Sequence, residues 1–185
     1  MRRKKEITTR SRGSALLEFA IAVPLLVVFI VGIFDFSAAF TQKQKIEHAA
    51  ETGAIAAGAQ TMADIDTTNP NPDSLQPVVS VVFNSLASDG VLPLANQGTC
   101  TVPAPAPQQN GLKWTYQINN CPDSVNIIID RGLVDPGTPA SVRTSVSVSY
   151  LYHWRFNSAI QLLFPGASYA ATTNVTEAAT THNQL

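Results

Sequence analysis

Few residues of this chain have the types and spacing that catalysis or metal binding requires. The histidines His48, His153 and His182 are scattered, and none has metal-ligand spacing or a cysteine beside it in a nucleophile motif. We expect His153 to end a strand among aromatic residues, the alternative being a binding role shared with Trp154 and Arg155. The glycines form no phosphate-binding loop, and there is no G-x-S-x-G motif. We therefore predict that the protein is not an enzyme and uses no metal, cofactor or small-molecule substrate.

A different kind of chemistry, charge pairing inside a membrane, is indicated by Glu18. It follows Gly13 by five positions and precedes Phe19–Phe34, a run of 16 residues without a charge. A carboxylate at the centre of a membrane helix costs roughly 2.5–3.5 kcal/mol on insertion scales, and less near an interface. Glu18 therefore either has a cationic partner or lies at headgroup level and reaches water. Asp35 comes 17 residues later, about 25 Å along a straight helix, and we expect it at the opposite interface.

The stretch from Ser14 to Phe40 is long enough to be a transmembrane helix, since about 20 apolar residues cross the hydrocarbon core. The alternative is a buried helix of a soluble protein, which is rarely hydrophobic on all sides directly behind a basic cluster. We expect Ser14 to act as the N-cap. Pro24 cannot donate a hydrogen bond to the carbonyl of Ala20, so a kink or local loosening is predicted there.

The charge distribution predicts the orientation of this helix. Six of the 12 basic residues lie in the first 12 positions, whereas the chain beyond Asp35 has six basic and ten acidic residues. This is the positive-inside arrangement, with the N-terminus in the cytoplasm and the remainder exported. Short basic arms also bind nucleic acid. No nucleic-acid partner is predicted here, because the arm abuts an apolar span and no aromatic or further basic patch follows it.

The two cysteines, Cys100 and Cys121, both lie in the part expected to be exported. An even pair in an oxidising compartment favours a disulfide. Such a bond would close a loop of about 20 residues and stabilise the fold by roughly 3 kcal/mol. The alternative is two unpaired buried cysteines. A metal site is disfavoured, because two cysteines 21 positions apart lack the paired spacing of zinc ligands.

The rest of the sequence predicts an α+β head. Helical character continues to about residue 68, with small residues suited to close packing, until two prolines occur within residues 69–74. A short amphipathic helix follows, and then several short β-branched or aromatic segments, of which 142–152 alternates most regularly. We predict four parts: a basic cytoplasmic leader at 1–13, a transmembrane helix at 14–40, a periplasmic continuation of the helix at 41–68, and an α+β head with an antiparallel sheet at 69–185.

The basic leader is followed by RGSALLEFAIAVPLL and then by GIFDFSAAF. This arrangement resembles the TadE-like family, pilin-like or pseudopilin components of the bacterial tight-adherence (Flp/Tad) machinery, most closely over residues 10–60. The resemblance implies a type IV pilin-like architecture and cleavage by a prepilin peptidase after Gly13, which would make Ser14 the new N-terminus. It also implies that Glu18 pairs with the terminal ammonium of the same or a neighbouring subunit and sets the register between helices.

The predicted function is that of a minor pilin-like subunit that acts within, or primes, an adhesive pilus. Its partners would be the bacterial inner membrane, a prepilin peptidase and other pilin-like subunits of the machinery. It would reside in the inner membrane as a single-pass protein with a periplasmic head, or in a surface pilus after incorporation.

Two alternatives remain at this stage. One is a membrane-anchored protein whose periplasmic head binds a ligand or an envelope partner and is never polymerised. The other is a secreted protein with a conventional signal peptide cut before Phe40, where SAAF offers a small-residue site. The apolar region is longer than the roughly 7–15 residues of such a signal, and Glu18 and Asp35 bracket it, which disfavours secretion.

Overall fold

The computed structural model of the chain describes residues 8–92, 100, 107–136, 141–156, 161, 166 and 172–183. The chain divides into two compact units. One unit consists of Met1–Ala38 with His153–Ala171, and the other of Ala39–Tyr152 with Thr172–Leu185. The sequence also predicts a strand at TCTV (99–102) and a short helix or turn at NSAIQLLF (157–164), and both segments fall mostly outside the described residues.

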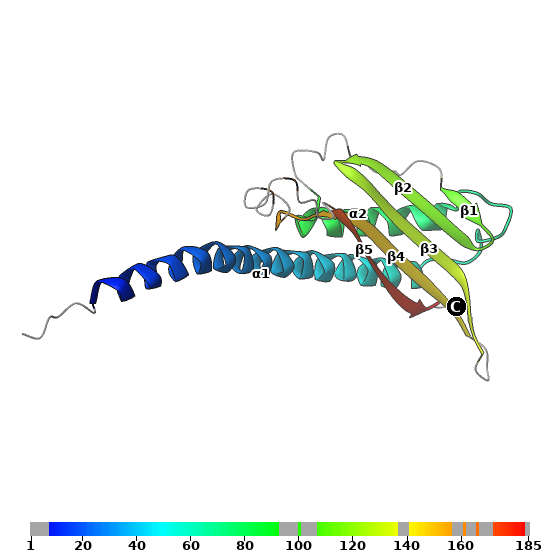
Figure 1. Cartoon of the computed structure of the whole chain (residues 1–185). Coiled ribbons are helices and arrows are strands. Elements are labelled where there is room, and N and C mark those ends of the chain that lie inside the picture. The colour runs from blue at the N-terminus through cyan, green and yellow to red at the C-terminus, as the bar shows by residue number, and fades with distance from the viewer. Residues whose placement is uncertain are drawn as a thin grey trace, which may run out of the picture. The chain divides into compact units, whose positions relative to one another are not determined.

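Helix α1 comprises Thr8–Gly58 and passes through Pro24 (Figure 1). Because α1 begins before Ser14, the prediction that Ser14 is the N-cap is wrong, and the hydroxyl of Ser14 has a different partner, described below. The helix also ends well before residue 68. Continuous helix across the predicted membrane span agrees with the apolar composition of this stretch.

The loop directly after α1, residues 59–72, is not helical, because polar side chains in this loop bind its own backbone. The Oδ1 atom of Asp66 accepts the backbone N–H of Thr68 at 2.5 Å and that of Asn69 at 2.7 Å. The Oδ2 atom of Asp64 accepts the backbone N–H of Ser74 at 2.8 Å. Such contacts offer the backbone an alternative to the helical ladder. The predicted helix to residue 68 is therefore wrong, even though the first proline comes only at the end of this loop.

A short 3-10 helix, η1 (Asp73–Leu75), leads into helix α2 (Gln76–Ser88), which confirms the predicted amphipathic helix. Proline in the first turn of α2 removes an N–H that would have no partner there. Gly90, just after α2, has a φ of 68°, which suits glycine and lets the chain turn. The buried side chains of α2 are those of Val78, Val79, Val82, Phe83 and Leu86.

Five strands form one sheet in the order β1-β2-β3-β4-β5, so each strand neighbours the next in sequence. The pairing is antiparallel, and the α+β fold class is confirmed. The strands are β1 (Gln108–Asn110), β2 (Lys113–Cys121), β3 (Asp123–Asp135), β4 (Ser141–His153) and β5 (Thr172–His182). The sequence PAPAPQQNG at 103–111 predicts a polar, proline-rich and hairpin-like loop, so strand β1 within it is a correction to that prediction. A turn at Gly111, with a φ of 64°, pairs β1 with β2.

Strand β4 shows the alternation that the sequence predicts. Its buried residues are Thr144, Val146, Val148, Tyr150 and Tyr152, with serines between them on the other face. Val142 departs from the pattern and is 40% exposed at the start of the strand.

Strand β5 runs antiparallel to β4 at the edge of the sheet. The hydroxyl of Thr176 donates to Ser149 Oγ at 2.9 Å, and the backbone N–H of Asn183 donates to the carbonyl of Val142 at 3.1 Å. Residue numbers thus rise on β5 as they fall on β4. The sequence SYAATTNVTEA at 168–178 predicts a last strand, and β5 extends beyond it to His182.

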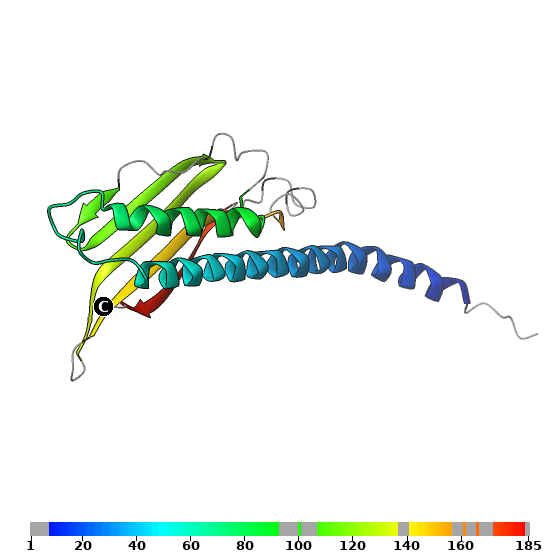
Figure 2. The ribbon, with the colours of Figure 1, turned by 180° about the vertical axis from the view of Figure 1, so that it is seen from behind.

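The hydrophobic core lies on the face of the sheet that α2 and residues 39–58 of α1 cover (Figures 1 and 2). The α1 side of this core is built from Ile46, Ala49, Ala50, Ala54 and Ala57. These small side chains allow close approach. An ideal Cβ at Gly53 would lie 2.4 Å from Val82 Cγ2, so glycine is required there.

Candidate functional site

The predicted processing and assembly residues Gly13, Ser14 and Glu18 lie together in the N-terminal part of α1 and are exposed. The hydroxyl of Ser14 donates a hydrogen bond to Glu18 Oε1 at 3.1 Å. This contact exists because residues four apart stand one above the other on a helix. The carboxylate of Glu18 therefore reaches the residue that cleavage after Gly13 would make the N-terminus.

Gly13 makes no packing contact with the described residues of the chain. An ideal Cβ at this position would meet no heavy atom within 4 Å. Glycine inside a helix is about 1 kcal/mol less favourable than alanine, so its presence weakens α1 locally without a compensating contact.

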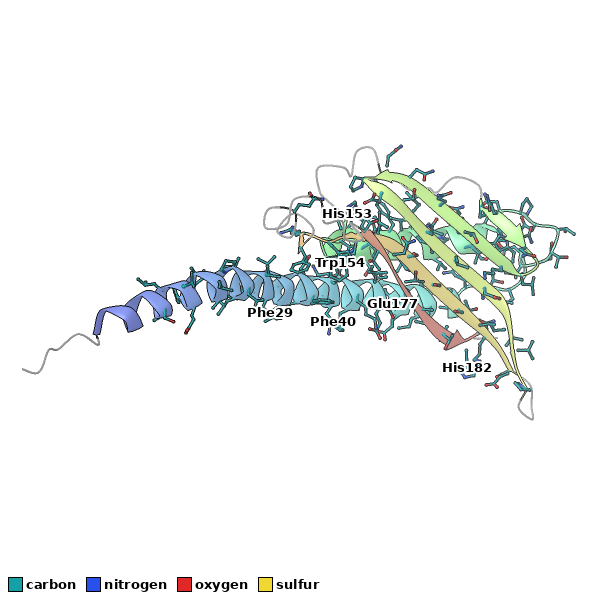
Figure 3. The ribbon with its side chains drawn as sticks, in the orientation of Figure 1. Phe29, Phe40, His153, Trp154, Glu177 and His182 are labelled. Atoms are coloured by element: carbon teal, nitrogen blue, oxygen red, sulfur yellow. A yellow bond between two sulfur atoms is a disulfide. The ribbon has the colours of Figure 1, made fainter. Side chains whose placement is uncertain are left out.

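The beginning of α1 has the surface of a lipid-facing helix. Among residues 13–45, all of which are described, only Asp35 is buried, while large apolar side chains are exposed. Phe29 and Phe40, for example, are 63% and 64% exposed (Figure 3). Among the described helices, only α1 is long and apolar enough to cross a membrane, over Gly13–Gly58. This is compatible with single-pass anchoring.

Pro24 lies within this exposed stretch and does not interrupt α1. Its missing N–H leaves the carbonyl of Ala20 without a helical donor. Membrane helices tolerate such a position when neighbouring groups satisfy the freed carbonyl. The predicted kink at Pro24 stays a prediction.

Asp35 belongs to a cluster that joins α1 to the residues just after β4. We call the cluster the Asp35 clasp and define it as Gly32, Asp35, Phe36, Trp154 and Phe156. The backbone N–H of Phe156 donates to Asp35 Oδ2 at 2.7 Å. The rings of Phe36 and Trp154 meet edge to face, with centroids 5.3 Å apart, and the Phe156 ring approaches within 3.6 Å of an ideal Cβ at Gly32. These residues line a hollow of about 100 Å³.

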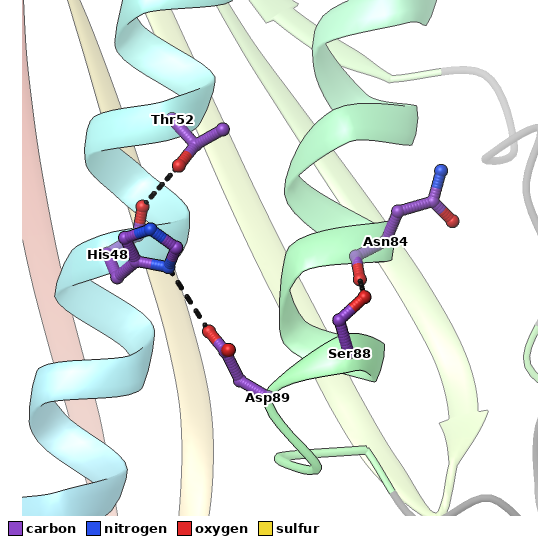
Figure 4. A network of polar contacts seen from close by, with 5 residues as sticks. All are labelled: His48, Thr52, Asn84, Ser88 and Asp89. Atoms are coloured by element: carbon purple, nitrogen blue, oxygen red, sulfur yellow. Dashed lines mark hydrogen bonds and ion pairs between the residues drawn. The ribbon is translucent and has the colours of Figure 1, made fainter.

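Polar contacts also connect α1 to α2 within the larger unit (Figure 4). The Nδ1 atom of His48 lies 3.2 Å from Asp89 Oδ2, just after the end of α2. In the same region Thr52 donates to the carbonyl of His48 at 2.8 Å, and Ser88 donates to the carbonyl of Asn84 at 2.7 Å. Because His48 and Asp89 are exposed or only partly buried, this contact, which is an ion pair only when His48 is protonated, is worth little on its own.

A second ion pair joins α1 to the edge strand. Lys43 Nζ lies 3.5 Å from Glu177 Oε1 on β5, and Figure 3 shows Glu177 directed toward α1. Beyond it, α1 and β5 enclose a shallow groove of about 380 Å³. Its lining residues are Glu47, Glu51, Ala54, Ile55, Ala178, Ala179, Thr180 and Thr181.

The structure also contains a buried cation that the sequence analysis did not single out. Arg131 on β3 is 0% exposed, and its Nη2 donates to the carbonyl of Gln60 at 3.1 Å. Burial lowers the pKa of Arg131, whereas the charge of Asp64 raises it. Burial also raises the pKa of the Tyr116 hydroxyl, with Asp64 adding to the shift. This group holds the loop after α1 against the sheet.

Cys100 and Cys121 form a disulfide, with a Cα–Cα distance of 4.8 Å. Cys121 ends β2, so the bond ties the chain near Cys100 to the sheet. The hydroxyl of Tyr150 contacts the carbonyl of Cys121 from β4. The disulfide thus sits at the edge of the buried core.

The described histidines lie on different elements: His48 on α1, His153 at the end of β4 and His182 at the end of β5. No group of three metal-ligating side chains occurs among the described residues. His153 ends β4, as expected, but it is exposed rather than packed among aromatics. The neighbouring Trp154, and not His153, packs against an aromatic ring, that of Phe36.

A family model described as TadE-like protein matches residues 13–54. The match confirms the resemblance over the segment that contains Gly13, Glu18 and Asp35. The TadE-like family, which is known as a structural component of pili, suggests a Tad pilus-related pseudopilin. No curated protein and no solved structure matched the chain.

Proposed function

We propose that this chain is a minor pilin-like subunit, or pseudopilin, for the assembly of a Tad/Flp-type adhesive pilus. The subunit is stored in the bacterial inner membrane with its N-terminus in the cytoplasm and its head in the periplasm. A prepilin peptidase cuts it between Gly13 and Ser14. The mature helix then packs against the helices of other pilin-like subunits.

One observation carries this proposal. In the segment that matches the family model, an exposed apolar helix has its one charged residue near the entrance, Glu18, bonded to Ser14. After cleavage, Ser14 would supply an ammonium group one helical turn from that carboxylate. Opposite charges offset the cost of taking each other out of water. The pairing within one subunit, or with the next, would fix how far neighbouring helices slide along one another.

The four predicted parts of the chain belong to this proposal. Residues 1–13 are removed, residues 14–40 span the membrane, residues 41–68 continue into the periplasm, and residues 69–185 form the head. The lack of a packing contact between Gly13 and the described residues supports recognition of its backbone by the peptidase.

The direct test is to determine the N-terminus of the protein recovered from cell membranes by mass spectrometry of its first peptide. A chain that begins at Ser14 supports the proposal. A chain that begins at Met1 or Arg2 indicates a plain membrane anchor, and one that begins at Phe40 indicates conventional secretion.

The variant Gly13→Ala sharpens this test, because the added methyl group meets no neighbour and favours the helix. We expect Gly13→Ala to accumulate uncut and correctly folded in the membrane. Normal cutting of this variant would contradict the role assigned to Gly13.

A further inference from the structure

The Asp35 clasp places a buried carboxylate inside an otherwise exposed apolar stretch. Asp35 is 4% exposed, whereas Ile33, Phe34 and Phe36 around it are 68%, 72% and 56% exposed. The apolar side chains are thus exposed and the acidic side chain is buried, which is the reverse of what is found on a helix that faces water. It is the arrangement expected where the surroundings are lipid, because an acid in a membrane helix turns toward protein and finds a donor there. The donor is the backbone N–H of Phe156.

The position of the clasp along α1 sets its depth if the helix spans the bilayer as proposed. Asp35 follows Ser14 by 21 residues. At about 1.5 Å per residue this is roughly 32 Å, and the hydrocarbon core is about 30 Å thick. A helix whose Ser14 lies at the cytoplasmic interface therefore brings Asp35 and Phe36 to the periplasmic interface.

The side chains of the clasp suit that depth. Trp154 is partly buried against Phe36, and the next residue, Arg155, is exposed. Tryptophan is enriched where acyl chains meet headgroups, because its ring is apolar and its N–H is polar. An adjacent arginine can contact lipid phosphates.

We propose that the Asp35 clasp is a second membrane contact, in which Trp154 and Phe156 lie among the lipid headgroups on the periplasmic side. Asp35 holds this segment on α1 and thereby fixes how deep the helix sits. The inference rests on the membrane placement in the proposed function, but it requires neither cleavage at Gly13 nor pilus assembly.

Tryptophan fluorescence tests the inference, because the chain has two tryptophans in different surroundings. Trp114 on β2 is 0% exposed in the protein core, and its Nε1 donates to the carbonyl of Asn69 at 3.2 Å. The full uncut chain is reconstituted into phosphatidylcholine vesicles that contain lipids brominated either near the headgroup or near the chain end. Trp154→Phe is the matched control, since only Trp114 then emits.

We expect headgroup-proximal bromine to quench the Trp154 share of the emission, and Trp154→Phe to lose that quenching. Equal emission from wild type with and without brominated lipid would overturn the proposal. Quenching by aqueous iodide instead would place the clasp in water, and protection from both quenchers would place it against another protein. Stronger quenching from the chain end would refute the interfacial depth.

Substitutions of Asp35 test whether its carboxylate holds the segment with Trp154 and Phe156 against α1. Asp35→Asn keeps an oxygen that accepts the Phe156 N–H, so we expect it to retain the headgroup quenching. Asp35→Ala removes the acceptor, and we expect the quenching to fall. Unchanged quenching in Asp35→Ala would refute the role of Asp35. If Asp35→Ala fails to insert, Phe36→Leu, which removes the ring contact with Trp154, provides the same comparison.

This outcome is separable from that of the proposed function. Cleavage at Gly13 without lipid contact at Trp154 would refute only the clasp. Lipid contact at Trp154 in a chain that is never cut would refute only the pilin-like role.

Discussion

Replacing Gly53 by alanine tests the packing of α1 against the head. In an open helix interior this change stabilises by about 1 kcal/mol. Here the new Cβ would lie 2.4 Å from Val82 Cγ2 and 3.1 Å from Val146 Cγ1, and both valines are 0% exposed. Overpacking of a core costs typically about 1–3 kcal/mol. Because neither short valine side chain can turn away into solvent, we expect a net loss of up to about 2 kcal/mol in the free energy of unfolding.

The assay is denaturant unfolding of the full chain in detergent micelles, followed by the emission of Trp114 in a Trp154→Phe background. Val82→Ala removes the methyl group that the new Cβ would meet. In that background we expect Gly53→Ala to be neutral or stabilising, which gives a coupling energy of about 1 kcal/mol or more. Gly13→Ala is the matched control, because it makes the same change without a neighbour.

A rise in stability for Gly53→Ala alone would refute the reasoning. It would mean that α1 does not approach α2 and β4 as closely as described. Equal effects of Gly53→Ala with and without Val82→Ala would show that the cost arises elsewhere.

Three further outcomes are expected. Glu18→Gln, which removes the charge, should leave membrane insertion intact but abolish incorporation into pili. Glu51→Gln, at an exposed position, is the control and should change neither insertion nor incorporation. Immunoblots of sheared pili measure the incorporation. Unfolded, unreduced protein should titrate no free thiol, and replacing Cys100 and Cys121 by serine should cost roughly 3 kcal/mol of unfolding free energy. The pKa of Asp64 is lowered, because burial, which raises it, is outweighed by hydrogen bonds from Ser74 and by the charge of Arg131. The ionised carboxylate of Asp64 therefore makes its full contribution to the free energy of unfolding above about pH 4, and this contribution is lost as the pH falls through the folded-state pKa. The free energy of unfolding of Asp64→Asn, measured against pH, should accordingly fall less steeply on the acid side.

The parts of the fold that local pattern dictates were predictable. The apolar stretch of α1 and the alternation of β4 from Thr144 to Tyr152 follow directly from residue type. The amphipathic helix α2 was equally clear, because its valines recur at helical spacing before the turn at Gly90.

The errors arise where contacts distant in sequence, or side chains bonded to the backbone, decide the structure. The end of α1 depends on Asp66 accepting backbone N–H groups, which composition alone does not reveal. Strand β1 exists because β2 pairs with it, not because its own residues favour a strand.

The clasp and the buried arginine escaped prediction for the same reason. Asp35 and Phe156 are 121 positions apart, and Arg131 and Gln60 are 71 apart. Only the unusual placement of an acid within an apolar stretch hinted that Asp35 had a partner. Nothing in the sequence around Arg131 distinguishes it from an arginine on the surface.

The order of strands in the sheet has a consequence for folding if the head is exported as proposed. Each strand pairs with its successor, so hairpins can close as the chain emerges, and contacts that are local in sequence form fast. Helix α1 is the exception. It emerges first, but its core-facing strip, the buried residues between Ile46 and Ala57, is covered only once α2 and the sheet have formed. A strip made mainly of alanine and glycine exposes little apolar surface during that delay. The small apolar area of this strip therefore limits non-specific association before the rest of the chain has folded against it.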